Sequence, residues 1–242
     1  MFEAYSRYKY ESLGITTWKY NVAWPAALTW QYVDWYKRAT AAYYGAKKAC
    51  EPVHALYGYN DSSLYVTNSY YHPVDGLTLT YAAYDLDGSK VSEEQVPVSV
   101  GADGVVKAAS VAMPEGVSDP WFLKLDLKDS NGTVLSENTY WLSHSPDIPG
   151  KTKDRGVFVV DPKSVANFTA LASLPEVALD ATLDGGSGQD EKTYTATIKN
   201  PSAHIAFMVE TSLVDPDTGL ALAPAYWSDN FVTLFPGDSR DL

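Results

Sequence analysis

Aromatic side chains gathered near the start of the chain are the residues whose types and spacing best suit ligand binding. Residues 18–25 read WKYNVAWP, and residues 30–36 read WQYVDWY. Large aromatic faces fill protein cores, and they also stack on the C–H faces of sugar rings. From these residue types alone, packing in a core and a platform for a sugar remain open alternatives.

The remaining reactive side chains do not form a metal-binding pattern. The four histidines are scattered over the chain without the i, i+4 spacing of paired helical ligands, so we expect no metal site and no cofactor. They are His54, His72, His144 and His204. Cys50 is the single cysteine and cannot form an internal disulfide, so stability must come from packing.

Composition restricts the classes of partner. The 242 residues carry a net charge of −12, which disfavours nucleic acid because binding it requires lysine and arginine to neutralise phosphates. There is no run of about 18 apolar residues, so no membrane span is expected. The start, Met-Phe-Glu-Ala-Tyr, does not resemble a secretion signal, which leaves either a cytoplasmic protein or a signal upstream of this chain.

The first fifty residues differ in character from the rest. They hold seven Lys and Arg against three Asp and Glu, whereas the whole chain holds 18 against 30. Their patterns predict a helix over residues 2–12, a short strand over 15–20, and a second helix over 25–38 that begins with proline. A strand between helices is typical of α/β folds, yet three elements cannot close a core, so this segment requires partners.

Residues 51–242 are predicted to be mainly β, with two sandwiches. Short alternating runs between residues 53 and 142, separated by Asp-Gly and Asn-Gly pairs, indicate an immunoglobulin-like sandwich over residues 51–147. A polar linker follows over residues 143–156. A second immunoglobulin-like sandwich is predicted over residues 157–242, with a turn at the glycine pair 185–186 and its last strand truncated.

Four segments together resemble one family of enzymes. Residues 18–25 resemble the motif W-x-x-N-x-x-W-P, and residues 30–36 the helix motif that follows it. Residues 44–54 (YGAKKACEPVH) and 228–237 (SDNFVTLFPG) resemble two later motifs in the same order. On these motifs the chain resembles glycoside hydrolase family 2 enzymes of the exo-β-D-glucosaminidase and β-mannosidase type, along essentially its whole length.

The resemblance implies a fold, an activity and a binding site. Residues 1–50 would be the C-terminal end of the (β/α)8 catalytic barrel, the terminal α/β segment of a TIM barrel, and two immunoglobulin-like sandwiches would follow. Trp18 would line the sugar subsite, with Asn21 and Trp24 shaping the pocket beside it. Lys19 departs from the family pattern, in which methionine or glutamine is frequent. The substrate would be a β-linked polysaccharide or oligosaccharide, hydrolysed from its non-reducing end with retention of configuration.

The resemblance also implies that the catalytic carboxylates lie elsewhere. Retaining hydrolysis needs two carboxylates about 5–5.5 Å apart. The family places both on barrel strands upstream of this segment, so we expect no catalytic residue here and no activity of this chain by itself. Glu3, Glu11 and Asp34 are interpreted as solvated or helix-supporting residues. The family's usual export implies a periplasmic or extracellular location.

A rival interpretation is a non-catalytic carbohydrate-binding or cell-surface module made of two sandwiches. It accounts for residues 53–242 equally well but gives no role to residues 1–50. A further alternative treats the sandwiches only as spacers or oligomer contacts. Under the hydrolase hypothesis the first fifty residues are predicted to lie against the first sandwich, with Trp18 or Trp24 more exposed than tryptophan usually is.

Overall fold

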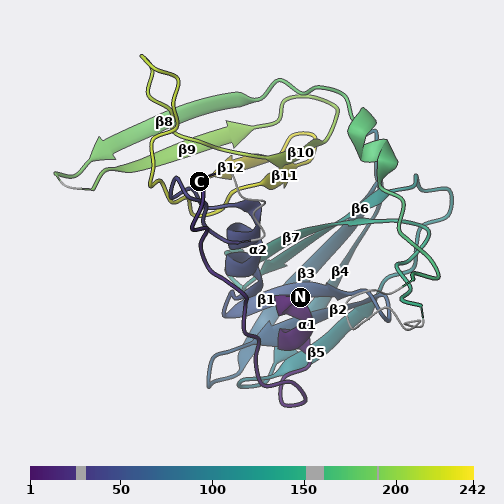
Figure 1. Cartoon of the computed structure of the whole chain (residues 1–242). Helices are drawn as coiled ribbons and strands as arrows, with labels where there is room; N and C mark the ends of the chain where they lie inside the picture. The colour runs from purple at the N-terminus through teal and green to yellow at the C-terminus, as the bar shows by residue number, and fades with distance from the viewer. Residues whose placement is uncertain (26–30, 151–160, 190) are drawn as a thin grey trace. The chain divides into compact units, whose positions relative to one another are not determined.

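The computed structural model describes residues 1–25, 31–150, 161–189 and 191–242 (Figure 1). Strands account for most of the regular structure in these residues, so the protein is mainly β, as predicted. The chain divides into two compact units. One comprises residues 55–176, and the other joins residues 1–54 to residues 177–242.

The first sandwich follows the alternating pattern of its sequence. Its strands are β1 (Val53–Gly58), β2 (Ser63–Asn68), β3 (Val74–Tyr84), β4 (Lys90–Val100), β5 (Val105–Ser110), β6 (Trp121–Lys128) and β7 (Val134–Leu142). They form two sheets, ordered β1-β2-β5 and β4-β3-β6-β7. Gly88 and Gly132 adopt positive φ in the hairpins after β3 and β6, which explains the Asp-Gly and Asn-Gly signals. The immunoglobulin-like prediction is confirmed.

The core of this sandwich shows why these residues form strands. Along β6, Leu123, Leu125 and Leu127 are fully buried, while Lys124 and Asp126 point to the other face and remain half-buried. This period of two matches the alternation of side chains on a pleated strand. Burying one such leucine contributes about 1.5–3 kcal/mol, so the apolar face fixes the register of β6 between β3 and β7.

The second sandwich is smaller within the described residues. Its strands are β8 (Asp180–Ser187), β9 (Thr193–Lys199), β10 (Ala206–Val209), β11 (Val232–Leu234) and β12 (Ser239–Asp241). They form two sheets, ordered β12-β9-β8 and β10-β11. A cluster of buried apolar side chains lies at its core: Ile198, Ala206, Val232, Leu234 and Leu242.

Each of the two sandwiches contains a similar polar corner, built on a buried asparagine. The buried amide of Asn68, which ends β2, donates to the carbonyls of His72 at 2.8 Å and Gly101 at 2.9 Å. In the second sandwich the buried Asn200 follows β9 and donates to the carbonyls of His204 at 2.7 Å and Leu234 at 2.9 Å. In each case the asparagine therefore satisfies backbone carbonyls that leave the sheet, and the sheet order β1-β2-β5 matches β8-β9-β12.

The prediction of a turn at Gly185 and Gly186 is wrong. Gly185 and Gly186 lie inside β8, with φ of 113° and 90°, and the pairing with β9 shifts register between Gly185 and Ser187. A Cβ on Gly185 would lie 2.6 Å from the carbonyl oxygen of Thr193. These glycines therefore form an irregularity within a strand, where only glycine fits, rather than the turn between strands.

The α/β segment predicted for residues 1–50 is not formed as expected. Helix α1 (Phe2–Arg7) ends five residues earlier than predicted, and residues 15–20 form no strand. Residues 26–30 of the predicted second helix lie outside the described residues, and residues 31–38 are turns and isolated bridges instead of helix. A barrel strand requires neighbouring strands to pair its backbone groups, and no such strands flank residues 15–20 in the described part of the chain.

A helix that the sequence pattern did not predict supplies regular structure instead. Helix α2 (Ala41–Ala49) begins after Thr40 and carries Lys47 and Lys48 in its last turn, where cations interact favourably with the helix dipole. Residues 1–54, α2 included, form their compact unit with residues 177–242. The prediction that the first fifty residues lie against the first sandwich concerns the relative placement of the two units and stays a prediction.

Candidate functional site

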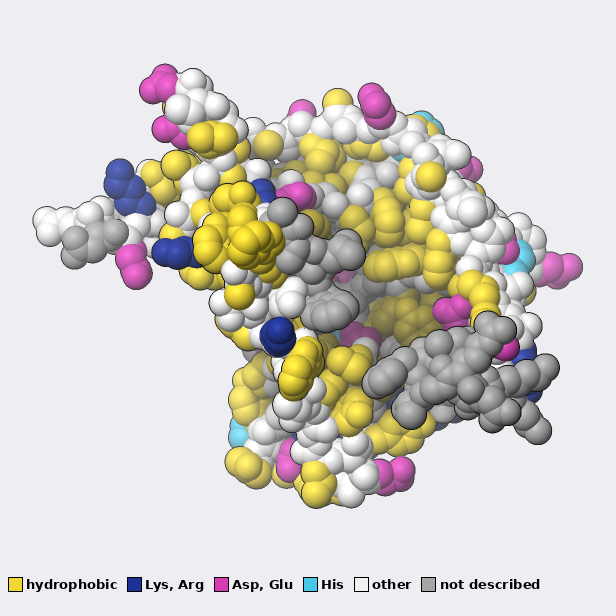
Figure 2. Space-filling model, in the orientation of Figure 1, with side chains coloured by type: hydrophobic (Ala, Val, Ile, Leu, Met, Phe, Trp, Pro, Cys, Tyr) yellow, Lys and Arg dark blue, Asp and Glu magenta, His cyan; other side chains and the backbone are white. Residues whose placement is uncertain are grey.

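The three residues predicted to bind sugar lie in a short exposed segment, residues 18–24, here called the aromatic segment. Trp18 is 79% exposed and Trp24 is 67% exposed. Asn21 is exposed as well, and its backbone forms an isolated parallel bridge with Val33. Trp18 and Trp24 are thus not core residues of the described structure. Figure 2 shows hydrophobic side chains, in yellow, on the surface of the face in view.

Backbone hydrogen bonds hold the middle of the aromatic segment. The amides of Tyr32 and Val33 both donate to the carbonyl of Tyr20, at 2.9 and 3.2 Å. The amide of Val22 donates to the carbonyl of Val33 at 3.1 Å, and the Val22 side chain is buried. The segment is thus fixed at its centre, while the tryptophans on either side of it project into solvent.

Residues 31–40 connect this framework to helix α2. The amide of Thr40 donates to the carbonyl of Tyr32 at 2.9 Å, and its hydroxyl donates to the carbonyls of Gln31 and Tyr32 at 3.0 and 3.2 Å. Thr40 is also the residue that precedes α2. Asp34, interpreted from the sequence as helix-supporting, forms an ion pair with Arg38 at 2.7 Å in a turn.

Helix α2 contacts a loop far along the sequence, residues 226–231, here called the anchor loop. The ammonium group of Lys47 donates to the carbonyls of Trp227 and Ser228 at 3.1 and 2.7 Å. Lys48 forms an ion pair with Asp229 at 2.7 Å. Their side chains are only 25% and 22% exposed, so this pair is more shielded from water than a typical surface pair.

Tyr44 adds a third contact between α2 and the anchor loop. Its buried hydroxyl accepts a hydrogen bond from the amide of Trp227 at 3.2 Å, and its ring centroid lies 6.2 Å from that of Phe231. Burial of the hydroxyl raises the pKa of Tyr44, although the hydrogen bonds of Trp227 and Asn230 act in the opposite direction. The group therefore remains a neutral phenol at physiological pH.

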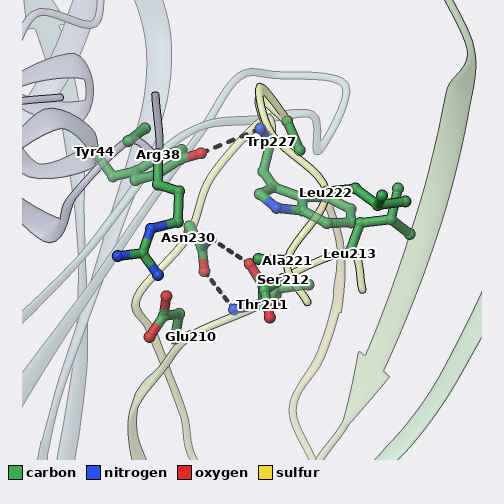
Figure 3. Close-up of a pocket in the computed structure, with 12 residues that line it drawn as sticks. Arg38, Tyr44, Glu210, Thr211, Ser212, Leu213, Ala221, Leu222, Trp227 and Asn230 are labelled. Carbon is green, nitrogen blue, oxygen red and sulfur yellow. Dashed lines mark hydrogen bonds between the residues drawn. The ribbon is translucent and has the colours of Figure 1, made fainter. Parts of the chain in front are cut away.

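Asn230 holds the anchor loop in place. Its side-chain oxygen accepts from the amide of Thr211 at 2.7 Å, and its side-chain nitrogen donates to the carbonyl of Thr211 at 2.8 Å. Figure 3 shows this pair of bonds beside a small pocket that Arg38, Tyr44 and Trp227 also line. The pocket encloses about 40 Å³, which suits a water molecule rather than a sugar ring.

A wider groove lies on the second sandwich. It encloses about 710 Å³, a volume within the range of ligand sites. The residues that line it include Glu191, Lys192, Tyr194, Leu222 and Tyr226. Tyr226 is 62% exposed. Aromatic faces and charged groups therefore meet in one exposed depression.

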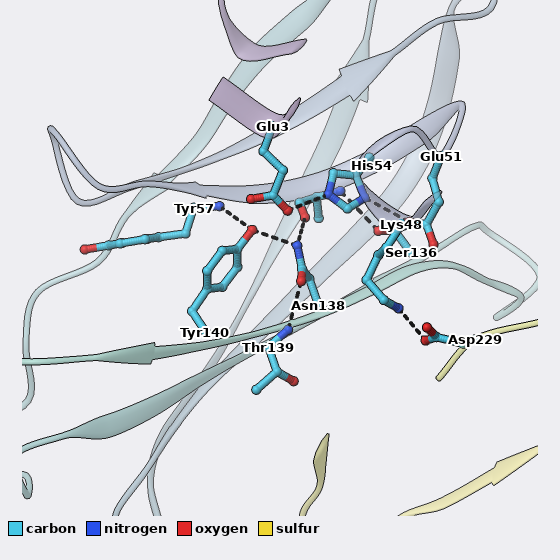
Figure 4. A network of polar contacts seen from close by, with 11 residues as sticks. Glu3, Lys48, Glu51, His54, Tyr57, Ser136, Asn138, Thr139, Tyr140 and Asp229 are labelled. Carbon is cyan, nitrogen blue, oxygen red and sulfur yellow. Dashed lines mark hydrogen bonds and ion pairs between the residues drawn. The ribbon is translucent and has the colours of Figure 1, made fainter. Parts of the chain in front are cut away.

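Two carboxylates enclose the buried imidazole of His54 (Figure 4). Nδ1 lies 2.8 Å from a carboxylate oxygen of Glu51, and Nε2 lies 3.0 Å from one of Glu3. Burial lowers the pKa of His54, but the hydrogen bonds and negative charges of Glu3 and Glu51 raise it more, so the net shift is upward. Glu3, interpreted from the sequence as solvated or helix-supporting, in fact ties α1 to the start of β1.

Two carboxylates are engaged with His54, and the described residues hold no cluster placed to bind a metal ion. Glu3 and Glu51 both bind His54, so neither is free to serve as the acid or nucleophile of a hydrolase. Residues 1–25, 31–150, 161–189 and 191–242 contain no group of three or more His, Cys, Asp or Glu residues placed to hold a metal ion. Within the same ranges, no helix combines the length and the apolar character that a membrane crossing requires.

The contacts between α2 and the anchor loop join two of the motifs identified in the sequence, and the sequence did not predict that these two motifs are in contact. Lys47 and Lys48 belong to the motif over residues 44–54, and Asp229 and Asn230 belong to the motif over residues 228–237. About 180 residues separate the partners. The one sequence feature that could have indicated this contact is the opposite charge of the two motifs, with two lysines in one and an aspartate in the other.

Two regions of the chain match known domain families. Residues 60–145 match a family described as the mannosidase Ig/CBM-like domain, and residues 157–242 match one described as the exo-β-D-glucosaminidase Ig-fold domain. All of the chain aligns with the exo-β-D-glucosaminidase of Amycolatopsis orientalis, at 37% identity, and covers 24% of that protein. It is 34% identical to the exo-β-D-glucosaminidase of Streptomyces avermitilis over its full length and covers 27% of that protein. The chain thus spans about a quarter of these curated relatives.

Solved structures give the same match. The crystal structure of the Amycolatopsis orientalis exo-chitosanase superposes with a TM-score of 0.89 at 34% identity, over 99% of this chain and 29% of that one. A β-D-mannosidase from Dictyoglomus thermophilum superposes over all of this chain and 25% of that one, with a TM-score of 0.66 at 18% identity. At that identity the second likeness supports the fold alone.

Proposed function

Because the chain carries immunoglobulin-like domains of the exo-β-D-glucosaminidase and β-mannosidase family of glycoside hydrolases, we propose that it is the C-terminal part of such an enzyme. The enzyme would be a retaining, exo-acting β-glycoside hydrolase with a β-linked polysaccharide or oligosaccharide as substrate. The observation that carries the proposal is the identity of 37% to an exo-β-D-glucosaminidase along the entire chain.

The proposal divides the chain into three parts. Residues 1–50 are the end of a catalytic barrel whose other strands lie in a longer polypeptide, and residues 51–147 and 157–242 are scaffold domains. In that polypeptide the backbone groups of residues 15–20 would find strand partners. The longer protein would be exported to the periplasm or the extracellular space, in keeping with the family.

The chemical step would use residues outside this chain. Retention of configuration requires one carboxylate as nucleophile and one as acid and base, about 5–5.5 Å apart. Within this chain, Glu3 and Glu51 are engaged with His54, at 3.0 and 2.8 Å. The chain by itself is therefore proposed to be inactive towards glycosides.

The aromatic segment would form one wall of the sugar pocket. Trp18 would stack on the sugar ring, and Asn21 and Trp24 would shape the pocket beside it. The exposure of Trp18 and Trp24 supports this role, since an apolar side chain that leaves 79% or 67% of its surface in water has capacity to cover a ligand.

The test uses the longer polypeptide and Trp18→Ala. The variant is expected to lower kcat/KM for nitrophenyl β-D-glucosaminide or β-D-mannoside at least about tenfold, which corresponds to about 1.4 kcal/mol of transition-state binding. Tyr71→Ala is the matched control, because Tyr71 is an aromatic residue that is 91% exposed and lies outside residues 18–40. Equal hydrolysis by Trp18→Ala and the wild type would show that the pocket assignment is wrong.

The wide groove favours a second candidate, a carbohydrate-binding module without catalysis. Tyr194 and Tyr226 line it, and aromatic faces of this kind suit sugar rings. Titration calorimetry of the intact chain with chito- and manno-oligosaccharides distinguishes the candidates. Affinity that disappears in Tyr226→Ala supports the module, whereas no measurable heat leaves the hydrolase part as the better account. Residues 1–54 must be kept because they form one unit with the second sandwich.

A further inference from the structure

We propose that the second sandwich positions the aromatic segment, and that Lys48 and Asp229 are positioning residues for sugar binding although neither lies in the sugar pocket. The inference rests on the proposed function, because it concerns the wall that Trp18 and Trp24 would form. It follows a continuous series of contacts from the anchor loop to Tyr20. All of these contacts lie within one compact unit.

The first step joins the anchor loop to α2. Lys48 and Asp229 are paired at 2.7 Å, and Lys47 donates to the carbonyls of Trp227 and Ser228. The Lys48 and Asp229 side chains are largely shielded from water, so removing one partner takes away the opposite charge nearest to a partly buried charge. The anchor loop is itself fixed by the two bonds of Asn230 to Thr211, so it provides a firm attachment for the helix.

The second step runs from the start of α2 to residues 31 and 32. Thr40 precedes the helix, and its amide and hydroxyl both bind the carbonyl of Tyr32. The hydroxyl also reaches the carbonyl of Gln31, whose side chain is buried. A rotation or shift of α2 would therefore displace Tyr32, because Thr40 donates two hydrogen bonds to its carbonyl and one more to the carbonyl of Gln31.

The third step reaches the aromatic segment. Tyr32 and Val33 donate to Tyr20, and Val22 donates to Val33. The ring centroids of Tyr20 and Tyr32 lie 6.0 Å apart, which adds a side-chain contact to the backbone bonds. The direction in which Trp18 and Trp24 project thus depends on residues 32 and 33, and through them on α2.

This arrangement predicts a particular kinetic effect. Loosening the wall weakens contacts that substrate and transition state share, because the sugar ring stacks in both, and such a change raises KM while leaving kcat nearly constant. A contact that only stabilises the fold would lower the melting temperature and leave KM unchanged. The ratio of the two kinetic constants therefore separates positioning from stability.

The experiment compares four variants of the longer polypeptide with the wild type. Lys48→Met keeps the aliphatic stem of the side chain and removes the charge. Asp229→Asn removes the charge and keeps the oxygen that accepts from the amide of Asn230. The third variant combines both changes. Gly45→Ala is the control on the same helix, since a Cβ there meets nothing within 4 Å.

With nitrophenyl β-D-glucosaminide as the probe, each single charge variant is expected to raise KM about fivefold with kcat within about twofold of wild type. The double variant is expected to raise KM no further, because the two residues act as one pair. Gly45→Ala should leave both constants unchanged. An unchanged KM in Lys48→Met, or effects that multiply in the double variant, would overturn the inference.

A second measurement keeps this inference separate from the proposed function. If the wild-type polypeptide hydrolyses neither β-glucosaminide nor β-mannoside, the proposed function fails, and hydrogen exchange then decides whether the contacts are coupled. Amides of residues 31–40 should exchange faster in Lys48→Met than in the wild type. Equal exchange in Lys48→Met and the wild type would overturn the coupling itself.

Discussion

The buried imidazole of His54 makes the stability of its unit depend on pH in a direction that can be worked out. Its pKa in the folded chain is raised above the value of about 6.5 for an unfolded histidine, because the contributions of Glu3 and Glu51 exceed the opposing effect of burial. A raised folded pKa means that this stabilisation is fully present below pH 6.5. It is lost as the pH rises through the folded pKa.

The substitution His54→Gln shows how much the two hydrogen bonds of His54 contribute to the free energy of unfolding. A glutamine amide carries both of its donors on one nitrogen, whereas the imidazole has one nitrogen facing each carboxylate, at 3.0 and 2.8 Å, so the variant loses the bond to one of the two. Hydrogen bonds to charged groups contribute about 1.5–3 kcal/mol, and the glutamate side chains are 22% and 29% exposed, so water replaces part of the lost bond. We expect a loss of about 2 kcal/mol in the free energy of unfolding at pH 5.5.

The assay is urea unfolding of the chain at pH 5.5 and pH 9, with hydrogen exchange of residues 1–12 as a local probe of α1. His144→Gln is the matched control, because His144 is exposed. The wild type should be less stable at pH 9, and the difference between wild type and His54→Gln should shrink there. A wild type that gains stability from pH 5.5 to pH 9, or a His54→Gln variant as stable as His144→Gln, would refute the reasoning.

Three further substitutions test the fold. Gly45→Ala should stabilise α2 by about 0.8–1.0 kcal/mol, seen as a higher melting temperature, because the helix gains propensity without a clash. Asn200→Ala should cost about 2–3 kcal/mol in urea unfolding, because the buried carbonyl of Leu234 and the carbonyl of His204 each lose a donor; a cost below that of an exposed Asn→Ala change would contradict this role of Asn200. Gly185→Ala should destabilise the second sandwich, because its Cβ would meet the Thr193 carbonyl at 2.6 Å; a melting temperature equal to wild type would count against the strand geometry.

The first sandwich was predictable because its local and tertiary signals agree. The leucines at alternating positions of β6 indicate its buried face, and the Asp-Gly and Asn-Gly pairs indicate hairpin turns. Gly185 and Gly186 carried a similar turn signal but lie inside a strand. Glycine is compatible with both a turn and an irregular strand. Which of the two forms depends on how closely the backbone of Thr193 packs against Gly185, and this contact cannot be read from the sequence.

Residues 1–50 were harder to predict because long-range contacts decide their structure. The proline at residue 25 and the apolar residues after it favoured a helix, yet the carbonyl of Tyr20 accepts the amides of Tyr32 and Val33. Conversely, α2 contains Gly45 and two tyrosines, which are modest helix formers, and it forms because Lys47, Lys48 and Tyr44 find partners in the anchor loop.

The motifs that carried the resemblance therefore have two physical roles that sequence alone does not separate. The tryptophans over residues 18–24 are exposed, whereas the lysines over residues 47–48 and the residues 228–230 bind one another. A ligand-binding residue has its partner outside the chain, and a structural residue has its partner within it. The geometry assigns the lysine and aspartate motifs to the structural class. It leaves Trp18 and Trp24 as residues with large apolar surfaces in water, which is the condition that a sugar-binding wall must meet before its substrate arrives.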